Sequence, residues 1–264
     1  MTGASRAGVA VVGALGRMGE RVREALSGHD RLELAGALEA PGHPGLGREL
    51  EAGVTVTDDA ERAFEKARVA IDFSLPDSTL ANLRVAAGAG VAYVTGTTGF
   101  NEEQRKELAA LAEQTPVLHA PNFSLAVNLL VRLTAEAARA LGQGVAAEIV
   151  ELHHAQKRDA PSGTALRLAE AIAEGRDQVL ADHLVLERAG DVGPRPDDAI
   201  GVQTLRGGDN PGEHTVLFIG DGERIELTHR SQTRDHFARG AVQAAAWILG
   251  REARLYSVDE VQGS

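Results

Sequence analysis

One stretch in the middle of the chain, residues 151–165, gathers side chains that can move protons and carry positive charge. His153 and His154 are adjacent, and Lys157 follows three residues later. Imidazole and amine groups act as general acids and bases in enzymes. The histidine pair is a poor metal chelate, because neighbouring residues of a strand point to opposite faces, and the chain contains no Cys. We therefore expect proton transfer here and no metal site.

The same stretch contains the start of a predicted helix that is suited to binding an anion. Ser162 falls at the N-cap position, and apolar residues recur at helical spacing from Leu166 onward. The amides of Gly163 and Thr164 would then point outward, where they attract anions. Gly163 also lets a ligand approach the backbone closely. The alternative interpretation is an ordinary helix cap that binds no ligand.

A glycine loop near the N-terminus has the setting of a dinucleotide-binding site. The apolar run 8–12 precedes a G-x-x-G-x-x-G pattern from Gly13 to Gly19, and a helical pattern follows. Leu15 stands where the commoner fingerprint has its second glycine, which weakens the motif taken alone. Glu39 ends the next predicted strand, where a carboxylate would accept hydrogen bonds from ribose hydroxyls. Together these features favour a dinucleotide site over a chance glycine turn.

The residue after this acid indicates which dinucleotide is bound. Glu39 is followed by Ala40, not by an arginine that could pair with a 2′-phosphate, so NADH is favoured. Arg17 lies inside the glycine loop and can meet a phosphate, so NADPH is the alternative.

The first half of the chain alternates short apolar runs with helical patterns. Runs at 68–74, 91–95 and 117–120 read as strands, and the second and third are followed by the loops 96–100 and 121–124. Such alternation predicts an α/β fold with a doubly wound parallel (Rossmann) sheet, whose strand ends line a ligand cleft. The loop glycines and hydroxyls could lie against a flat ring there, although an ordinary turn is the alternative.

After a long Ala/Leu-rich helix, residues 125–141, the chain changes character. Runs at 200–205, 214–219 and 224–229 are expected to be antiparallel neighbours, separated by Gly-Gly and Asp-Gly turns. With 145–150 they predict a smaller α+β domain with a four-stranded mixed sheet, whose bare face would invite self-association. A final helix, 235–249, is expected to return to the first domain. The predicted domains are 1–123 with 236–264, for the dinucleotide, and 124–235, for substrate and assembly.

Composition limits the partners. A formal net charge of -11 and an aromatic share of 3% argue against nucleic acid. The absence of Cys fits a reducing compartment. No apolar run reaches membrane-spanning length, and residues 1–8 lack an apolar signal core. We expect a cytoplasmic protein whose anionic ligand binds a basic island.

Taken together, these motifs resemble the 4-hydroxy-tetrahydrodipicolinate reductase (dihydrodipicolinate reductase) family. The segment E-L-H-H-x-x-K-x-D-A-P-S-G-T-A is highly specific, and the likeness covers nearly the whole chain. The resemblance implies NAD(P)H-dependent reduction of 4-hydroxy-tetrahydrodipicolinate, a cyclic dicarboxylate, to tetrahydrodipicolinate in the diaminopimelate route to lysine. It also implies a homotetramer built through the second domain's sheet.

The resemblance also implies roles for individual residues. It makes His153 a proton donor or acceptor and Lys157 a second proton donor. It places the substrate at His154, Ser162, Gly163 and Thr164. It places the pyrophosphate at Gly13, Ala14, Leu15, Gly16, Arg17 and Met18, and the adenosine ribose at Glu39. It places the nicotinamide end at Gly96, Thr97, Thr98, Ala120, Pro121, Asn122 and Phe123.

Two other functions fit the same motifs. An amino-acid dehydrogenase of similar two-domain build would keep the cofactor site and change the substrate. A non-catalytic dinucleotide sensor would bind the cofactor without using His153 or Lys157. Consumption of NADH with the expected substrate separates a reductase from a sensor.

Overall fold

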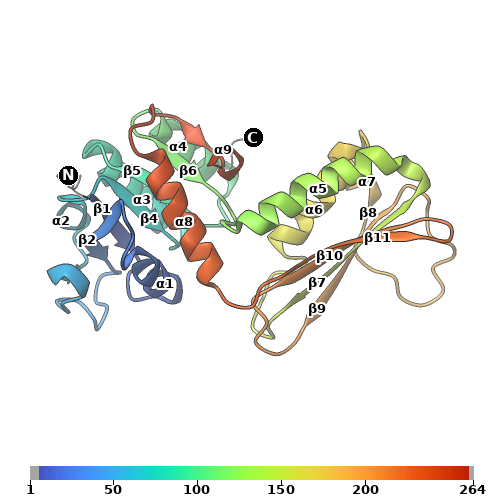
Figure 1. The fold of residues 1–264 in the computed structure, drawn as a ribbon, viewed down its shortest axis with the longest axis horizontal. Coiled ribbons are helices and arrows are strands. Elements are labelled where there is room, and N and C mark those ends of the chain that lie inside the picture. Colours follow the sequence, from blue (N-terminus) through green and yellow to red (C-terminus); the bar gives the residue numbers. More distant parts are fainter. Residues whose placement is uncertain (1–5, 262–264) are drawn as a thin grey trace. The chain divides into compact units, whose positions relative to one another are not determined.

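The computed structural model describes residues 6–261, which form two compact units (Figure 1). Of the described residues, unit 1 comprises 6–124 and 234–261, and unit 2 comprises Leu125–Thr233. Residues 1–5, on which the expectation of no signal segment partly rests, lie outside the described residues. Within 6–261, every helix is too short or too polar to cross a membrane.

Unit 1 is built on a seven-stranded sheet in which every pairing is parallel. Its strands are β1 (Ala7–Val12), β2 (Leu32–Leu38), β3 (Val56–Thr57), β4 (Val69–Asp72), β5 (Ala92–Thr95), β6 (Val117–His119) and β12 (Leu255–Tyr256). The order β12-β6-β5-β4-β1-β2-β3 reverses direction between β1 and β4, and ligands of such sheets bind outside the strand C-termini at this point. The predicted doubly wound parallel sheet is confirmed.

Helices cover both faces of this sheet, because its strands are apolar on both sides. The helical elements of unit 1 are α1 (Arg17–Leu26), η1 (Glu51–Gly53), α2 (Ala60–Phe64), α3 (Pro76–Gly88), α4 (Glu102–Ala112), α8 (Asp235–Ile248) and α9 (Val258–Val261). Val9 and Val11 of β1 belong to the core beneath α1 and α8, whereas Ala10 and Val12 face the core beneath α2, α3 and α4. Because successive side chains of a strand point to opposite faces of the sheet, β1 contributes to the cores on both faces.

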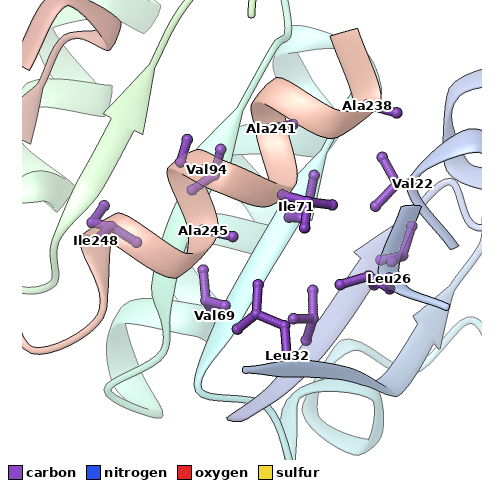
Figure 2. Packing of buried hydrophobic residues seen from close by; sticks show 14 of the residues in the cluster. Val22, Leu26, Leu32, Val69, Ile71, Val94, Ala238, Ala241, Ala245 and Ile248 are labelled. Carbon is purple, nitrogen blue, oxygen red and sulfur yellow. The ribbon is translucent and has the colours of Figure 1, made fainter. Parts of the chain in front are cut away.

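Helix α8 comes from the C-terminal part of the chain yet packs on the central strands of the first sheet. Ala241, Ala245 and Ile248 lie over Ile71 and Val94 (Figure 2). The small alanines let the helix approach the sheet closely. A Cβ atom added to Gly240 would overlap the carbonyl oxygen of Phe123, so glycine is required there.

Unit 2 contains a mixed sheet with the order β11-β10-β7-β9-β8. Its strands are β7 (Ala146–His153), β8 (Leu184–Val185), β9 (Ile200–Arg206), β10 (Glu213–Ile219) and β11 (Arg224–Arg230). The predicted mixed sheet is confirmed, but the prediction of four strands is wrong, because β8 pairs with β9 as a fifth. A two-residue strand is too short to show the alternating pattern on which the prediction relied.

The expected antiparallel pairing of the runs 200–205 and 214–219 is also wrong. Strand β7 lies between them, parallel to β9 and antiparallel to β10. The loop 207–212 passes around the end of β7: Gly207 donates its N–H to His153, while His154 and Ala155 donate theirs to Asn210 and Gly208. This loop is longer than a hairpin turn, so its two strands can flank a third.

Helices cover one face of the unit 2 sheet. The helical elements are α5 (Leu125–Leu141), η2 (Gly142–Gly144), α6 (Gly163–Gly175) and α7 (Leu180–His183), and Figure 1 shows α5 and α6 running alongside one another. The inward side chains of β7, such as Ala147 and Ile149, are buried in their shared core. The opposite face carries Leu205 and Ile219, which are 51% and 41% exposed.

Candidate active site

The glycine loop connects β1 to α1 in unit 1 and contacts the C-terminal end of β2. Gly13 has a φ of +66°, a conformation that favours glycine, and Gly16 is the N-cap of α1. The amides of Gly13 and Ala14 both donate to the carbonyl of Leu38, at 2.8 and 3.2 Å. The turn is therefore fixed against β2, and the helix start that follows is available to a phosphate.

The predicted ribose acid, Glu39, lies beside this loop. Its carboxylate accepts the amide N–H of Leu15 at 2.7 Å, and the residue is half-buried. A Cβ atom at Gly19 would overlap the carbonyl oxygen of Gly13, so the third glycine is needed for close contact between loop and helix. Gly13, Leu15, Gly16 and Glu39 are thus brought together, whereas the Arg17 side chain is exposed.

The two loops predicted for the nicotinamide end meet at the C-terminal ends of β5 and β6. Thr97 is buried, and its carbonyl lies 3.0 Å from Nε2 of His119. The amide of Ala120 donates to the carbonyl of Thr95 at 3.1 Å. A Cβ atom at Gly96 would overlap the ring of Phe73, which stands edge-on to Phe123 with ring centroids 5.7 Å apart. Gly96–Thr98 and Ala120–Phe123 therefore share one region.

A buried polar network that the sequence did not reveal supports this region. The carboxylate of Asp72 accepts the Tyr93 hydroxyl at 2.8 Å and the Ser74 amide at 2.7 Å. Burial raises the pKa of Asp72 and raises that of Tyr93 well above its usual value. The Thr79 hydroxyl lies 2.7 Å from the Thr97 hydroxyl, so the network holds the loop after β5.

In unit 2, the expected proton donor lies at the end of β7 and is held by a carboxylate. His153 is buried, and its Nδ1 is hydrogen-bonded to Glu151, which is fully buried. They are two positions apart on the strand, so both point to the helix-covered face. Burial acts to raise the pKa of Glu151, but hydrogen bonds from His153, Arg206 and a backbone amide outweigh it and lower the pKa to about 2.

Helix α6 begins at the predicted N-cap, Ser162. Its hydroxyl accepts the Ala165 N–H at 3.1 Å and also lies 3.1 Å from Nε2 of His214. Its amide donates to Glu151 at 3.0 Å. Ser162 is 2% exposed, so these contacts fix the helix start, and its direct contact with substrate stays a prediction. The next residue, Gly163, is exposed and has open space at its Cβ position.

Lys157 lies in the turn between the histidine pair and α6. Its amide donates to the carbonyl of His154 at 3.1 Å, and its Nζ forms an ion pair with Asp159 at 2.9 Å. Burial acts to raise the pKa of Asp159, but the hydrogen bond from Lys157 outweighs it and lowers the pKa. The ammonium group is therefore positioned by a carboxylate on the same turn.

Sequence reasoning missed four residues of this cluster. They are Glu151, Thr204, Arg206 and His214. The only local signal was the charge of Glu151 at an inward position of an otherwise apolar strand face. The other three come from β9 and β10, and only strand pairing brings them near β7.

The cluster also contains a set of possible metal ligands, Glu151, His153 and His214, whose ligand atoms lie within 4.8 Å of one another. The chemistry of the set does not fit a cation. The Arg206 guanidinium contacts both oxygens of Glu151 at 3.0 Å, and its positive charge would repel a metal ion.

A parallel sheet of the nucleotide-binding type joined to an α+β unit is the fold of two-domain α/β oxidoreductases. An amine dehydrogenase from Mycobacterium smegmatis shares this fold, with a TM-score of 0.60 at 15% identity, covering 98% of this chain and 97% of that one. The dipicolinate-bound dihydrodipicolinate reductase from Paenisporosarcina sp. TG-14 has a TM-score of 0.77 at 26% identity, covering 96% and 98%.

Sequence comparison identifies the family. Residues 7–123 match the family model "Dihydrodipicolinate reductase, N-terminus", and residues 126–261 match "Dihydrodipicolinate reductase, C-terminus". The 4-hydroxy-tetrahydrodipicolinate reductase of Anaeromyxobacter dehalogenans (strain 2CP-1) is 45% identical over 262 residues, 97% of each chain. That of Ralstonia pickettii is 45% identical over 97% of this chain and 99% of its own. The chain belongs to the dihydrodipicolinate reductase family, which confirms the resemblance.

Proposed function

We propose that this protein reduces 4-hydroxy-tetrahydrodipicolinate to tetrahydrodipicolinate with NAD(P)H, in the diaminopimelate route to lysine. The observation that carries the proposal is the close similarity, along 97% of the chain, to reductases of that name. The dipicolinate bound to the Paenisporosarcina relative is itself a cyclic dicarboxylate, which supports a small dianionic substrate here.

The residues of unit 1 fit a dinucleotide. The glycine loop offers a helix start to the pyrophosphate, and Glu39 offers a carboxylate to the ribose. The exposed Ala40 next to Glu39 offers no charge to a 2′-phosphate, which supports NADH over NADPH. Gly96–Thr98 and Ala120–Phe123 would hold the nicotinamide end. Bound NAD(P)H supplies the hydride.

The residues of unit 2 would bind the dianion and move protons. His154, Lys157 and the start of α6 at Gly163 and Thr164 would receive the carboxylates, because basic groups and helix-start amides both attract anions. The 4-hydroxyl leaves as water with one proton, which creates a conjugated ring. One hydride and one proton then complete the reduction, and His153 or Lys157 would deliver that proton.

Two further features concern the oligomeric state of the protein and its cellular compartment. The uncovered face of the unit 2 sheet, with Leu205 and Ile219 exposed, supports a homotetramer formed through that face. A cytoplasmic location is supported by the absence of cysteine, which fits a reducing compartment.

A turnover assay tests the proposed reaction. Loss of NADH absorbance with substrate generated by a coupled synthase is expected for the wild-type protein. Lys157→Ala and His153→Ala should each lower kcat by about 100-fold or more and leave NADH affinity unchanged. Lys106→Ala is a matched control, because it also removes an ion-paired lysine, to Glu102, but on the surface of unit 1.

Two outcomes would contradict the proposal. A wild-type protein that binds NADH but shows no turnover would instead support a dinucleotide sensor. Wild-type rates in both the Lys157 and His153 variants would refute the assigned proton donors.

A further inference from the structure

A single buried carboxylate lies at the centre of the unit 2 cluster. Besides the Nδ1 of His153, Glu151 accepts the Ser162 amide at 3.0 Å and the Thr204 hydroxyl at 3.1 Å. Arg206 donates one Nη to each of its oxygens, both at 3.0 Å. Five donors therefore converge on one side chain that is 0% exposed.

The register of the sheet creates this convergence. Thr204 of β9 pairs with Glu151 of β7. Two residues further along both strands, Arg206 pairs with His153. All four side chains lie on one face, because residues two apart on a strand point the same way. His214 of β10 pairs with Glu151 from the other side, and its ring centroid lies 5.0 Å from that of His153.

The hydrogen bond to Glu151 decides which nitrogen of His153 can exchange a proton. Glu151 is ionised at neutral pH, so its carboxylate only accepts, and the Nδ1 of His153 must carry the hydrogen. Nε2 is then the nitrogen that gains or loses a proton. A Cβ atom at Gly212 would lie 2.9 Å from Nε2, so a larger residue there would crowd this atom.

The same carboxylate links the proton donor to the anion-binding helix start. One oxygen of Glu151 accepts the Ser162 amide, and the other accepts His153. Ser162 is the N-cap of α6, and Gly163 and Thr164 follow it directly. A shift of Glu151 would therefore move the imidazole and the helix start together.

We propose that Glu151 is a positioning residue of the reductase: clamped by Arg206 and Thr204, it fixes the tautomer of His153 with Nε2 as the exchanging nitrogen, and it holds that imidazole in register with the start of α6. This inference rests on the proposed function. The residue acts through His153 and Ser162 and needs no contact with substrate.

The competing explanation is that Glu151 is only a structural ion pair. Glu148, on the same strand, offers a direct comparison, because it also binds two arginines, Arg188 and Arg195, at 2.7–2.8 Å. Its side chain points to the opposite face of β7, away from His153. Loss of either glutamate breaks an ion-pair network, but only Glu151 contacts the imidazole.

The first test compares the pH dependence of kcat/KM in Glu151→Gln and Glu148→Gln. The titratable and charged groups around His153 are Glu151 on β7, Arg206 on β9, His214 on β10 and, in the following turn, Lys157 with its ion-pair partner Asp159. Removal of the Glu151 charge should move the inflection of the kcat/KM profile to lower pH and lower kcat roughly 10- to 100-fold. NADH affinity should not change, and Glu148→Gln should keep the wild-type inflection.

The second test measures the tautomer directly in the wild-type protein, so it does not depend on whether a variant folds. ¹⁵N NMR of the histidine rings, assigned with a His153→Gln variant, should show neutral His153 protonated at Nδ1. A neutral His153 protonated at Nε2 would overturn the inference, as would an unchanged pH profile in folded Glu151→Gln. An equal shift in Glu148→Gln would also overturn it. Absence of wild-type turnover would refute the proposed function instead.

Discussion

The carboxylate of Glu39 accepts the amide N–H of Leu15, with 2.7 Å between Oε1 and N. The acid that ends β2 is therefore tied to the middle of the glycine loop after β1. Leu15 takes the place of a glycine in the commoner fingerprint, but this contact uses only its backbone. The same carboxylate can thus fix the loop and receive the ribose.

Replacement of Glu39 should weaken cofactor binding. Glu39→Ala removes hydrogen bonds to a charged group, each worth about 1.5–3 kcal/mol, so the Kd for NADH should rise roughly 10- to 100-fold.

Ala40→Arg should tighten NADPH binding by adding a partner for the 2′-phosphate. Fluorescence titration with both dinucleotides measures these changes. Glu33→Ala, which removes a half-buried acid on β2 that pairs with Arg6, is the control. No gain in NADPH affinity in Ala40→Arg would count against the assigned preference.

The close contact of Gly19 with the glycine loop can be tested by adding a single methyl group. Gly19→Ala should displace the carbonyl of Gly13 and raise the Kd for NADH at least about tenfold, because overlap with backbone costs roughly 1–3 kcal/mol. Gly88→Ala is the matched change. It lies at the end of α3 with open space around it, so stability should stay the same or rise by up to about 1 kcal/mol. Equal effects of the two substitutions on NADH binding would show that the contact is unimportant.

Unit 2 should lose stability in acid because two of its buried groups bind protons more weakly when folded. Burial and the nearby His153 lower the pKa of His214 to about 3, and Glu151 has a pKa of about 2. Both folded values lie below the ordinary ones. The stabilising contribution of His214 is therefore present above about pH 6.5 and lost toward pH 3, and that of Glu151 is lost below about pH 4.5.

His214→Gln separates these contributions. Gln can still bond to Ser162 but does not titrate. Between pH 6.5 and 4.5, the unfolding free energy of the variant should therefore fall by about 2 kcal/mol less than that of the wild type. Hydrogen exchange of the β7 amides at several pH values reports on unit 2 alone. If the variant and the wild type lose stability in parallel over this range, His214 is not the group responsible.

Much of the fold could be predicted from the sequence, because its signals are local. The apolar run before Gly13, the glycine spacing and the acid at Glu39 all lie within one β-α-β segment. The N-cap of α6 was read from Ser162 and the helical spacing after it. Each of these features depends on residues close together in the chain, so a single sequence contains the information.

The Glu151 cluster could not be predicted, because it depends on strand order. The loop 207–212 carries the chain past β7, and this places Thr204 and Arg206 on one side of β7 and His214 on the other. Taken singly, each is an ordinary polar residue in a strand. The sequence favoured β9 and β10 as direct neighbours, an arrangement that would have removed β7 and Glu151 from between them.

The uncovered face of the unit 2 sheet leads to a prediction about assembly. Leu205 of β9, its pairing partner Leu152 and Ile219 of β10 all lie on this face, where they accompany polar side chains such as Glu148. Burial of such a face between copies stabilises an oligomer by roughly 25 cal/mol per Å² of apolar area. The double variant Leu205→Lys with Ile219→Lys should place charges in the proposed interface and convert the proposed tetramer of 27.7 kDa chains into smaller species. Light scattering measures the mass, and circular dichroism checks the fold.

Leu75→Lys, at a leucine of unit 1 that is 70% exposed, is the control and should leave the mass unchanged. A tetramer that survives the double variant would place the interface on another surface of the protein.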